Sequence, residues 1–324
     1  MNLFSALEIK KYNLRNRVVI PPMARSLAKP DGEVTDELLS HYEEISRYPG
    51  LTIVEHSYVS ERGRYSQNQL GVNSDNLIPS LKKLSEKIKE NGSISALQIN
   101  HSGPRADRKV LGNKPLAPSE EGTKKEVEAL NKEKMNLIKE KFGEAAERAV
   151  KAGFDAIEVH GAHGFLLNSF TSPLTNKRDD EYGGSLKNRS KFPLEVVKEV
   201  KDRIGDKLLL YRIGATDHDT NGLKISEAKK LSKKLENKGV DIIDVSGGLC
   251  GSRPKELQEK EGYFVPEAKE IKNAVNAPVI GVGGIKDPKK ANKFIKKQKV
   301  DLVAVGRANL KDPKWIKRAR KELI

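Results

Sequence analysis

Short apolar runs alternate with longer amphipathic stretches along the whole chain, and this alternation restricts the fold more than any other feature. The runs are rich in β-branched residues and too apolar to present a face to water, as buried strands are. Eight runs occur: RVVIPPM (17–23), LTIVEHS (51–57), ISALQINH (94–101), DAIEVHG (155–161), LLLYRIG (208–214), DIIDVSG (241–247), PVIGVGG (278–284) and DLVAVGR (301–307). Buried parallel strands need covering helices, and eight strand–helix units favour a closed (β/α)8 TIM barrel over an open sheet.

The stretches that follow the runs have the apolar spacing of helices. Gly153 and Gly239 stand just beyond two expected helix ends, and Pro288 and Pro313 lie near two first turns. The predicted helices span 36–48, 77–89, 134–151, 189–203, 226–238, 265–275, 288–297 and 313–323. Residues 1–16 would cap the barrel, and we expect one α/β domain over 1–324. The connections 101–131 and 161–188 exceed ordinary turns in length, as functional loops do.

The composition is that of a soluble globular protein, with 36% apolar and 32% charged residues among 324. No run approaches the ~20 apolar residues of a membrane helix, and the first residues do not resemble a signal peptide, so we expect a cytoplasmic protein. The single cysteine, Cys250, excludes an intrachain disulfide. The net charge is +15, but the basic segments are not interleaved with aromatic residues or Arg/Gly pairs as in proteins that bind single strands. We therefore expect neither a specific nucleic acid nor a membrane as partner.

Polar residues interrupt four of the apolar runs on one side of the strand. Because side chains alternate along a strand, Ile157 and Val159 facing outward would turn Glu158 and His160 into the barrel. The same alternation turns four more polar residues inward: Gln98, Arg212, Asp244 and Ser246. Each alone fits a buried polar residue with its hydrogen bonds satisfied. Together, at the strand ends where barrels place their chemistry, they favour an active site.

Glycines and an arginine follow the last two runs, where barrels commonly bind phosphate. GVGG contains Gly283 and Gly284, and Gly306 precedes Arg307, a cation suited to a phosphate. The pair His160 and His163 has no third metal ligand at a convincing spacing, so we expect no metal. Two imidazoles over a cavity can instead donate hydrogen bonds to a substrate oxygen that becomes negative.

Four segments resemble, in order along nearly the whole chain, the old yellow enzyme family of NADH:flavin oxidoreductases. They are NRVVIPPM (16–23), ALQINHSG (96–103), HGAHGFLLNSFTSPLTNKRDDEYGGSLKNR (160–189) and DLVAVGR (301–307). The resemblance implies an enzyme with an FMN cofactor and NADPH or NADH as reductant. It further implies ene reduction, in which hydride passes through flavin N5 to α,β-unsaturated carbonyl or nitro compounds in a ping-pong sequence.

The resemblance also implies residue roles. His160 and His163 match the pair that holds the substrate oxygen. The cofactor positions, along the flavin, at its polar edge and at its phosphate, would be Pro22, Met23, Ala24, Gln98, Arg212, Gly283, Gly284, Gly306 and Arg307. Members of the family often form homo-oligomers, although no patch in the sequence is identified as an interface.

Three departures from the family pattern stand out. Phe165 replaces the tyrosine that protonates the substrate α-carbon, and Ala24 replaces a Thr or Cys that bonds flavin O4. The cysteine cluster of the iron–sulfur relatives is absent. We expect Phe165, Arg25 and Arg105 at the substrate, and the two arginines predict a preference for anionic substrates.

Other functions remain open from the sequence. Phe165 is compatible with a flavin barrel that uses another electron acceptor or only binds a ligand. The positive charge suits a tRNA-modifying enzyme like the dihydrouridine synthases, although these need a catalytic cysteine in an early loop and an RNA-binding extension, neither of which is present.

Overall fold

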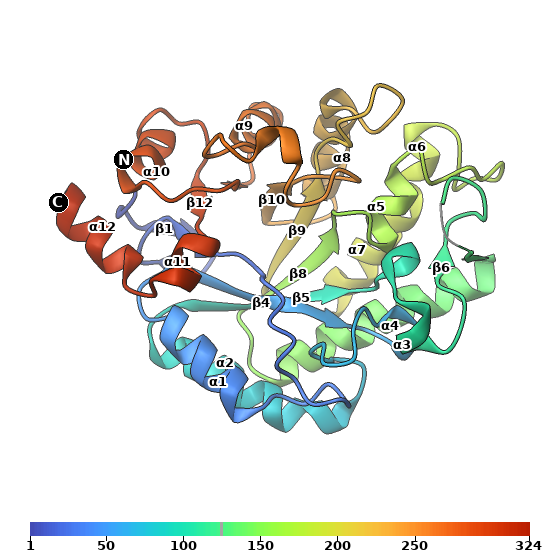
Figure 1. Ribbon diagram of the computed structural model, residues 1–324, viewed down its shortest axis with the longest axis horizontal. Helices are drawn as coiled ribbons and strands as arrows, with labels where there is room; N and C mark the ends of the chain where they lie inside the picture. The colour runs from blue at the N-terminus through green and yellow to red at the C-terminus, as the bar shows by residue number, and fades with distance from the viewer. Residues whose placement is uncertain (124–125) are drawn as a thin grey trace.

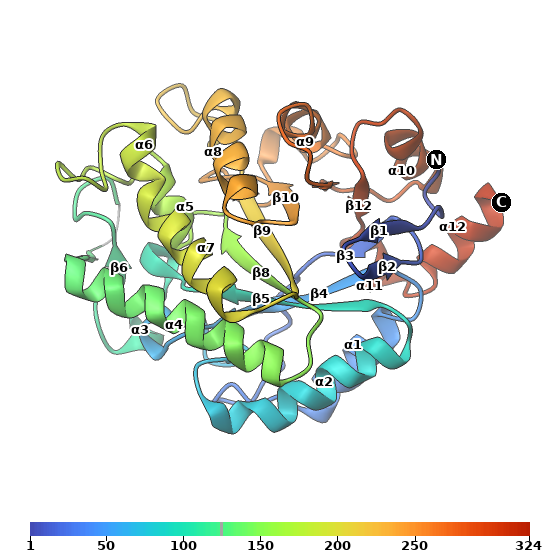
Figure 2. The same cartoon turned by 180° about the vertical axis from the view of Figure 1, so that it is seen from behind.

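A computed structural model describes residues 1–123 and 126–324. Its centre is a closed barrel of eight strands that follow one another in chain order, each paired in parallel with the next, and β12 pairs with β3 to complete the ring (Figures 1 and 2). The strands are β3 (Val18–Ile20), β4 (Leu51–Tyr58), β5 (Ile94–Asn100), β8 (Ala156–Gly161), β9 (Leu208–Gly214), β10 (Ile242–Ser246), β11 (Val279–Gly281) and β12 (Leu302–Ala304). The predicted TIM barrel is therefore confirmed.

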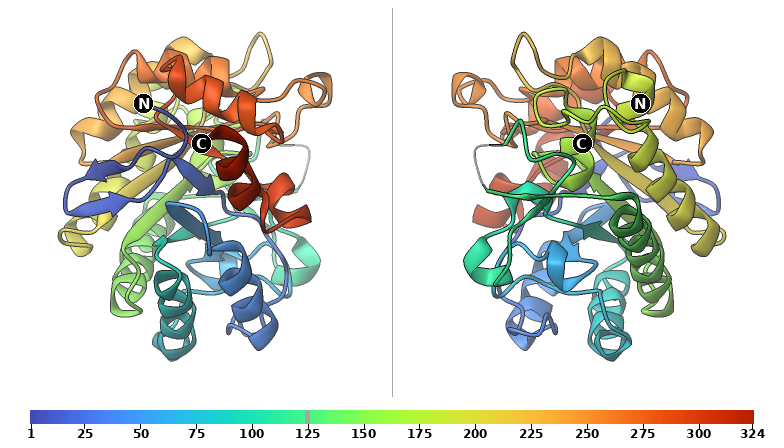
Figure 3. Two further views of the ribbon diagram at one scale, coloured as in Figure 1. Left: turned by 90° about the vertical axis from the view of Figure 1, so that its left-hand side faces the viewer. Right: turned by 90° about the vertical axis from the view of Figure 1, so that its right-hand side faces the viewer.

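Helices surround the ring, as the two opposite views of Figure 3 show. The long helices are α1 (Asp36–Ile45), α2 (Ile78–Glu90), α4 (Lys132–Lys151), α7 (Lys191–Arg203), α8 (Ile225–Asn237), α9 (Val265–Lys272), α10 (Pro288–Lys296) and α12 (Trp315–Leu323). Each of the first seven lies in the connection between two barrel strands, and α12 follows β12. None of the helices in the described residues is both long and apolar enough to span a membrane.

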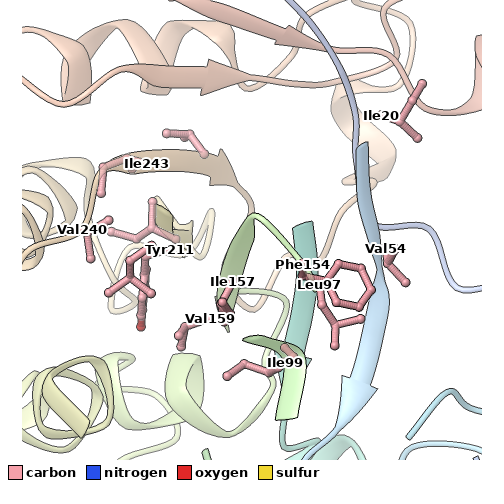
Figure 4. Close-up of a cluster of buried hydrophobic side chains, with 14 of the residues drawn as sticks. Ile20, Val54, Leu97, Ile99, Phe154, Ile157, Val159, Tyr211, Val240 and Ile243 are labelled. Atoms are coloured by element: carbon pink, nitrogen blue, oxygen red, sulfur yellow. The ribbon is translucent and has the colours of Figure 1, made fainter. Parts of the chain in front are cut away.

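Apolar side chains fill the barrel on both surfaces of its strands. Ile157 and Val159 point outward into the core beneath the helices, next to Tyr211 of the neighbouring strand (Figure 4). Inside the ring, Ala156 and Leu210 join a separate core. The alternation predicted from the sequence for β8 is confirmed.

A hairpin of β1 (Leu7–Ile9) and β2 (Tyr12–Leu14) closes the end at which the strands begin. Its Tyr12 and Leu14 pack on barrel residues such as Leu51. Residues 1–16 thus cap the barrel as expected. The polar end of the barrel, where the strands finish, remains open to the connecting loops.

Several predicted elements are shorter in the structure. Pro21 lacks an amide hydrogen, which fits the end of β3 at Ile20. Helices α1 and α9 end three residues early, with Ser46 and Asn273 as their caps. The two long connections contain short helices and strands: α3 (Arg108–Leu111), β6 (Leu116–Ala117), β7 (Glu128–Ala129), α5 (Leu166–Thr171) and α6 (Leu186–Arg189). A further short helix, α11 (Arg307–Lys311), follows β12.

Candidate active site

A cavity of about 710 Å³ lies at the carboxyl ends of the barrel strands. This volume is in the range of cofactor and substrate sites. Every site residue predicted from the sequence except Gly283 lines it: Pro22, Met23, Ala24, Arg25, Gln98, Arg105, His160, His163, Phe165, Arg212, Gly284, Gly306 and Arg307. Gly283 instead supports the wall, since a Cβ there would lie 2.6 Å from the backbone nitrogen of Tyr263.

The floor of the cavity carries a buried amide–acid pair. Gln98 and Glu158 are direct neighbours across β5 and β8, and Gln98 Nε2 donates to Glu158 Oε1 at 2.7 Å. Burial raises the pKa of Glu158 well above its usual value, and the negative charge of Asp244 adds to this shift. The Gln98 amide is therefore held in place by an acid that favours its neutral form.

A buried ion pair lies beside it. Arg212 and Asp244 face each other across β9 and β10, with Arg212 Nε 3.2 Å from Asp244 Oδ2. Among the described residues neither group has a hydrogen-bond partner, so the attraction is coulombic. Burial raises the pKa of Asp244 and the guanidinium lowers it. With a cation at contact distance, Asp244 ionises more readily than Glu158.

Two imidazoles meet above this floor. The rings of His160 and His163 are 5.1 Å apart and inclined at 73°. His163 adopts a left-handed backbone conformation (φ 61°), uncommon for a residue with a side chain. Its Nε2 lies 2.7 Å from Ser246 Oγ, which leaves the Nδ1 side for a ligand. His160 Nδ1 is buried and has no hydrogen-bond partner in the described part of the chain.

Burial keeps both rings uncharged. It lowers the pKa of each histidine well below the usual value, and the positive charge of Arg212 lowers both further. A neutral imidazole has one N–H donor and one acceptor nitrogen. The pair can thus offer hydrogen bonds to a ligand oxygen as neutral rings.

The opposite end of the cavity is basic and glycine-lined. Arg307 Nη2 lies 3.3 Å from the hydroxyl of Tyr263, and a Cβ at Gly284 would come within 3.4 Å of that same nitrogen. At Gly306 a Cβ would lie 2.8 Å from Met23 Sδ. Only glycine leaves this backbone accessible beside a guanidinium, which suits a phosphate.

The predicted substrate residues also line the cavity. Phe165 packs on His160 with ring centres 4.9 Å apart. Arg105 Nε donates to the backbone oxygen of His163 at 3.0 Å. The Arg25 backbone amide donates to Glu55 Oε2 at 2.8 Å, and the residue is part of the cavity lining.

His56 and Tyr65 are among the cavity residues that sequence reasoning missed. The pairing of β4 with β5 shifts register between Val54 and Ser57, so alternation along β4 does not predict which way His56 faces. Gln69 Nε2 lies 2.7 Å from His56 Nδ1, and Gln69 Oε1 accepts from the Tyr65 amide. This arrangement orients the amide as a donor to Nδ1, which places the imidazole proton on Nε2.

The lone cysteine does not have the properties of a nucleophile. Cys250 follows β10, and its Sγ lies 3.3 Å from the Thr216 carbonyl oxygen. Burial raises the thiol pKa to about 12. A tRNA-modifying enzyme with a reactive cysteine therefore receives no support from this residue.

A barrel with polar residues at the strand ends, paired imidazoles and a basic glycine-lined end defines a cofactor-dependent enzyme of the TIM-barrel class. The family model described as "NADH:flavin oxidoreductase / NADH oxidase family" matches residues 2–324. The chain belongs to this family, whose members are flavin oxidoreductases with FMN as cofactor, and the resemblance noted in the sequence is confirmed.

Individual relatives agree with this assignment. An NADPH dehydrogenase of Bacillus subtilis is 38% identical over 329 residues, covering 99% of this chain and 95% of the relative. An NADH oxidase of Thermoanaerobacter brockii is 38% identical, and this chain spans 50% of its length. Morphinone reductase in complex with tetrahydroNAD superposes with a TM-score of 0.86 at 27% identity, over 100% of this chain and 92% of that one.

Proposed function

We propose that this protein uses NADPH or NADH to reduce activated C=C bonds of α,β-unsaturated carbonyl or nitro compounds through FMN, with residues 1–324 as one FMN-binding domain. The observation that carries the proposal is the pair His160 and His163. Two neutral rings in one cavity, one of them with a buried nitrogen that lacks a protein partner, form a binding site for a single ligand oxygen.

The residues of the cavity fit FMN. The Arg212 guanidinium has no hydrogen bond at Nε, and the Gln98 amide retains donor and acceptor capacity beyond its bond to Glu158. These two would hold the polar edge of the flavin ring, with Pro22, Met23 and Ala24 along it. Arg307 with Gly284 and Gly306 would hold the phosphate, supported by Gly283 behind them.

Bound FMN supplies the transfer of hydride from the nicotinamide to the substrate β-carbon. The histidines hold the substrate oxygen and stabilise the negative charge that develops there as the C=C bond is reduced. Because both rings are already neutral N–H donors, no proton has to leave them before the substrate binds. Removing one donor to such an oxygen typically costs 10²–10³-fold in rate.

The entrance favours anionic substrates in this proposal. Arg25 and Arg105 both line the cavity and are exposed to a ligand there. Arg108, which is near them in the sequence, does not line the cavity and is paired with Glu126 at 2.7 Å. An unsaturated carboxylate would thus meet two cations while its reacting end lies at the histidines.

The first test follows the visible spectrum of the FMN-loaded protein without oxygen. Added NADPH or NADH should bleach the flavin, and 2-cyclohexenone should then restore it. The H160A/H163A variant should be bleached normally and restored at least about 100-fold more slowly. A flavin that stays bleached in the unaltered protein would contradict ene reduction and indicate another electron acceptor, whereas a flavin that nicotinamide cannot bleach would indicate ligand binding alone.

A second test measures substrate charge. R25A should lose about tenfold in kcat/KM for an unsaturated carboxylate, which corresponds to about 1.4 kcal/mol, and should keep its value for a neutral enone. R108A removes a neighbouring arginine outside the cavity and serves as the matched control. An equal effect of R25A on charged and neutral substrates would refute the preference.

A further inference from the structure

Phe165 cannot act as the acid that the proposed reaction needs. Reduction of a C=C bond adds a proton at the α-carbon as well as a hydride at the β-carbon, and a phenyl ring has no proton to give. Within the proposed function, on which this role rests, another group of this chain must supply that proton.

Four residues that line the cavity carry hydroxyl groups: Tyr65, Ser246, Ser252 and Tyr263. Ser246 Oγ lies 2.7 Å from a nitrogen of the paired imidazoles. The Tyr263 hydroxyl donates to the Ser252 backbone oxygen at 2.8 Å, which places both residues at the phosphate end. The fourth hydroxyl is that of Tyr65, and it has no hydrogen-bond partner among residues 1–123 and 126–324.

His56 is the other candidate near Phe165. Burial lowers the pKa of this histidine to about 4, so the ring is neutral in the working range. A neutral imidazole donates hydrogen bonds but gives up its remaining proton far less readily than a phenol does. His56 is therefore a donor in the cavity wall and not the acid.

Tyr65 is held beside the position that lacks the acid. Its ring meets Phe165 edge-on, with centres 5.6 Å apart and planes at 82°, and it meets His56 in the same way at 5.7 Å. Gln69, which is 3% exposed, accepts a hydrogen bond from the Tyr65 amide at 2.6 Å. Arg64 ties the same loop to the backbone oxygens of Pro30, Ser66 and Gln67.

Tyr65 can also recover a proton after giving one up. Its side chain is 41% exposed, in contrast to Phe165 at 8%. The residue is therefore in contact with solvent and also lines the cavity. An acid that acts once in each turnover needs such a connection to water.

We propose that the Tyr65 hydroxyl protonates the substrate α-carbon. After hydride reaches the β-carbon, the substrate is an enolate whose oxygen is held by the histidines. The enolate electron pair forms the new C–H bond at the α-carbon with the phenol proton, the C=O double bond re-forms and the O–H bond of Tyr65 breaks. The tyrosinate then takes a proton from water.

The test compares Y65F, which removes only the hydroxyl, with Y48F, the same change outside the cavity. Both FMN-loaded proteins are reduced with NADPH and mixed with 2-methyl-2-cyclohexenone without oxygen. Y65F should be reoxidised about 100-fold more slowly, with nicotinamide oxidation and thermal unfolding unchanged. Its product should lose the single α-carbon configuration that the unaltered protein produces, and the added F165Y change should restore both rate and configuration.

Three results would overturn the inference. Reoxidation of Y65F at the original rate, with the original product configuration and solvent isotope effect, would refute Tyr65 while leaving ene reduction intact. Equal slowing in Y65F and Y48F would show an effect unrelated to the cavity. Failure of the unaltered protein to be reoxidised by any enone would refute the proposed function and, with it, this role.

Discussion

The ion pair between Arg212 and Asp244 makes a quantitative prediction about stability. Its atoms are 3.2 Å apart, and the side chains are 6% and 0% exposed. At an effective dielectric constant of 20, that separation gives about 5 kcal/mol of attraction, an upper value for the pair. Removing one partner of a buried pair typically costs about 3–5 kcal/mol. We therefore expect R212M to lower the free energy of unfolding of the apoprotein by about 3 kcal/mol or more at pH 8.

The two single variants should differ, because only one partner reaches the cavity. In D244N the unpaired Arg212 still borders the cavity, whereas in R212M the carboxylate of Asp244 remains fully buried. R212M should therefore be the more destabilised of the two. In R212M/D244N no uncompensated charge is left, so the double variant should be more stable than the sum of the single effects predicts.

The pH dependence of the free energy of unfolding provides a second test of this prediction. Without Arg212, burial alone acts on Asp244 and raises its folded-state pKa further. A carboxyl whose folded pKa exceeds its unfolded pKa destabilises the fold as pH rises above the unfolded value. R212M should thus lose stability between pH 5 and pH 8 relative to R212M/D244N.

Urea unfolding followed by the fluorescence of Trp315, the only tryptophan and a buried one, measures all four proteins. An R212M variant within about 1 kcal/mol of the unaltered protein, with no coupling to D244N and no added pH dependence, would refute this reasoning.

Three further predictions concern other residues. Burial raises the pKa of Glu55 from 4.5 to about 7. Between these two values the folded state retains a proton that the unfolded state has lost. The free energy of unfolding should therefore fall, by on the order of 3 kcal/mol, as pH rises from 4.5 to about 7. Urea unfolding of E55Q should show a smaller fall, and equal pH profiles would contradict the shift. G283A should weaken FMN binding at least about tenfold, because the φ of 132° at Gly283 and the nearby Tyr263 leave no room for a methyl group. Fluorescence titration with FMN measures the change, and G205A, with open space around it, is the control. Cys250, with its thiol pKa raised to about 12, should react slowly with a thiol reagent at pH 8 in the native protein and quickly in urea; rapid native labelling would contradict this.

The barrel and its inward polar residues could be predicted from the sequence because both depend on local periodicity. Alternation along β8 assigns Glu158 and His160 to one side and Ile157 to the other without knowledge of any neighbour. The ends of the elements do not follow from this periodicity, as the shorter β3 and α9 show, because a strand or helix continues only as far as its hydrogen-bond partners do.

The partners of these residues depend on the tertiary structure. That Glu158 binds Gln98 and Arg212 meets Asp244 follows from the register of neighbouring strands, which no local pattern specifies. His56 enters the cavity wall where the β4 pairing shifts register, and a register shift of one residue reverses the side on which a side chain lies.

Tyr65 shows the same limit for loops. It follows β4 in a segment without periodicity, and its place beside Phe165, 100 residues away in the chain, comes from Gln69 and from the closure of the barrel. The sequence by itself therefore determined the barrel, its polar end and the family. Which side chains meet across the cavity was decided only by tertiary structure, because contacts between distant segments depend on the packing of the whole ring.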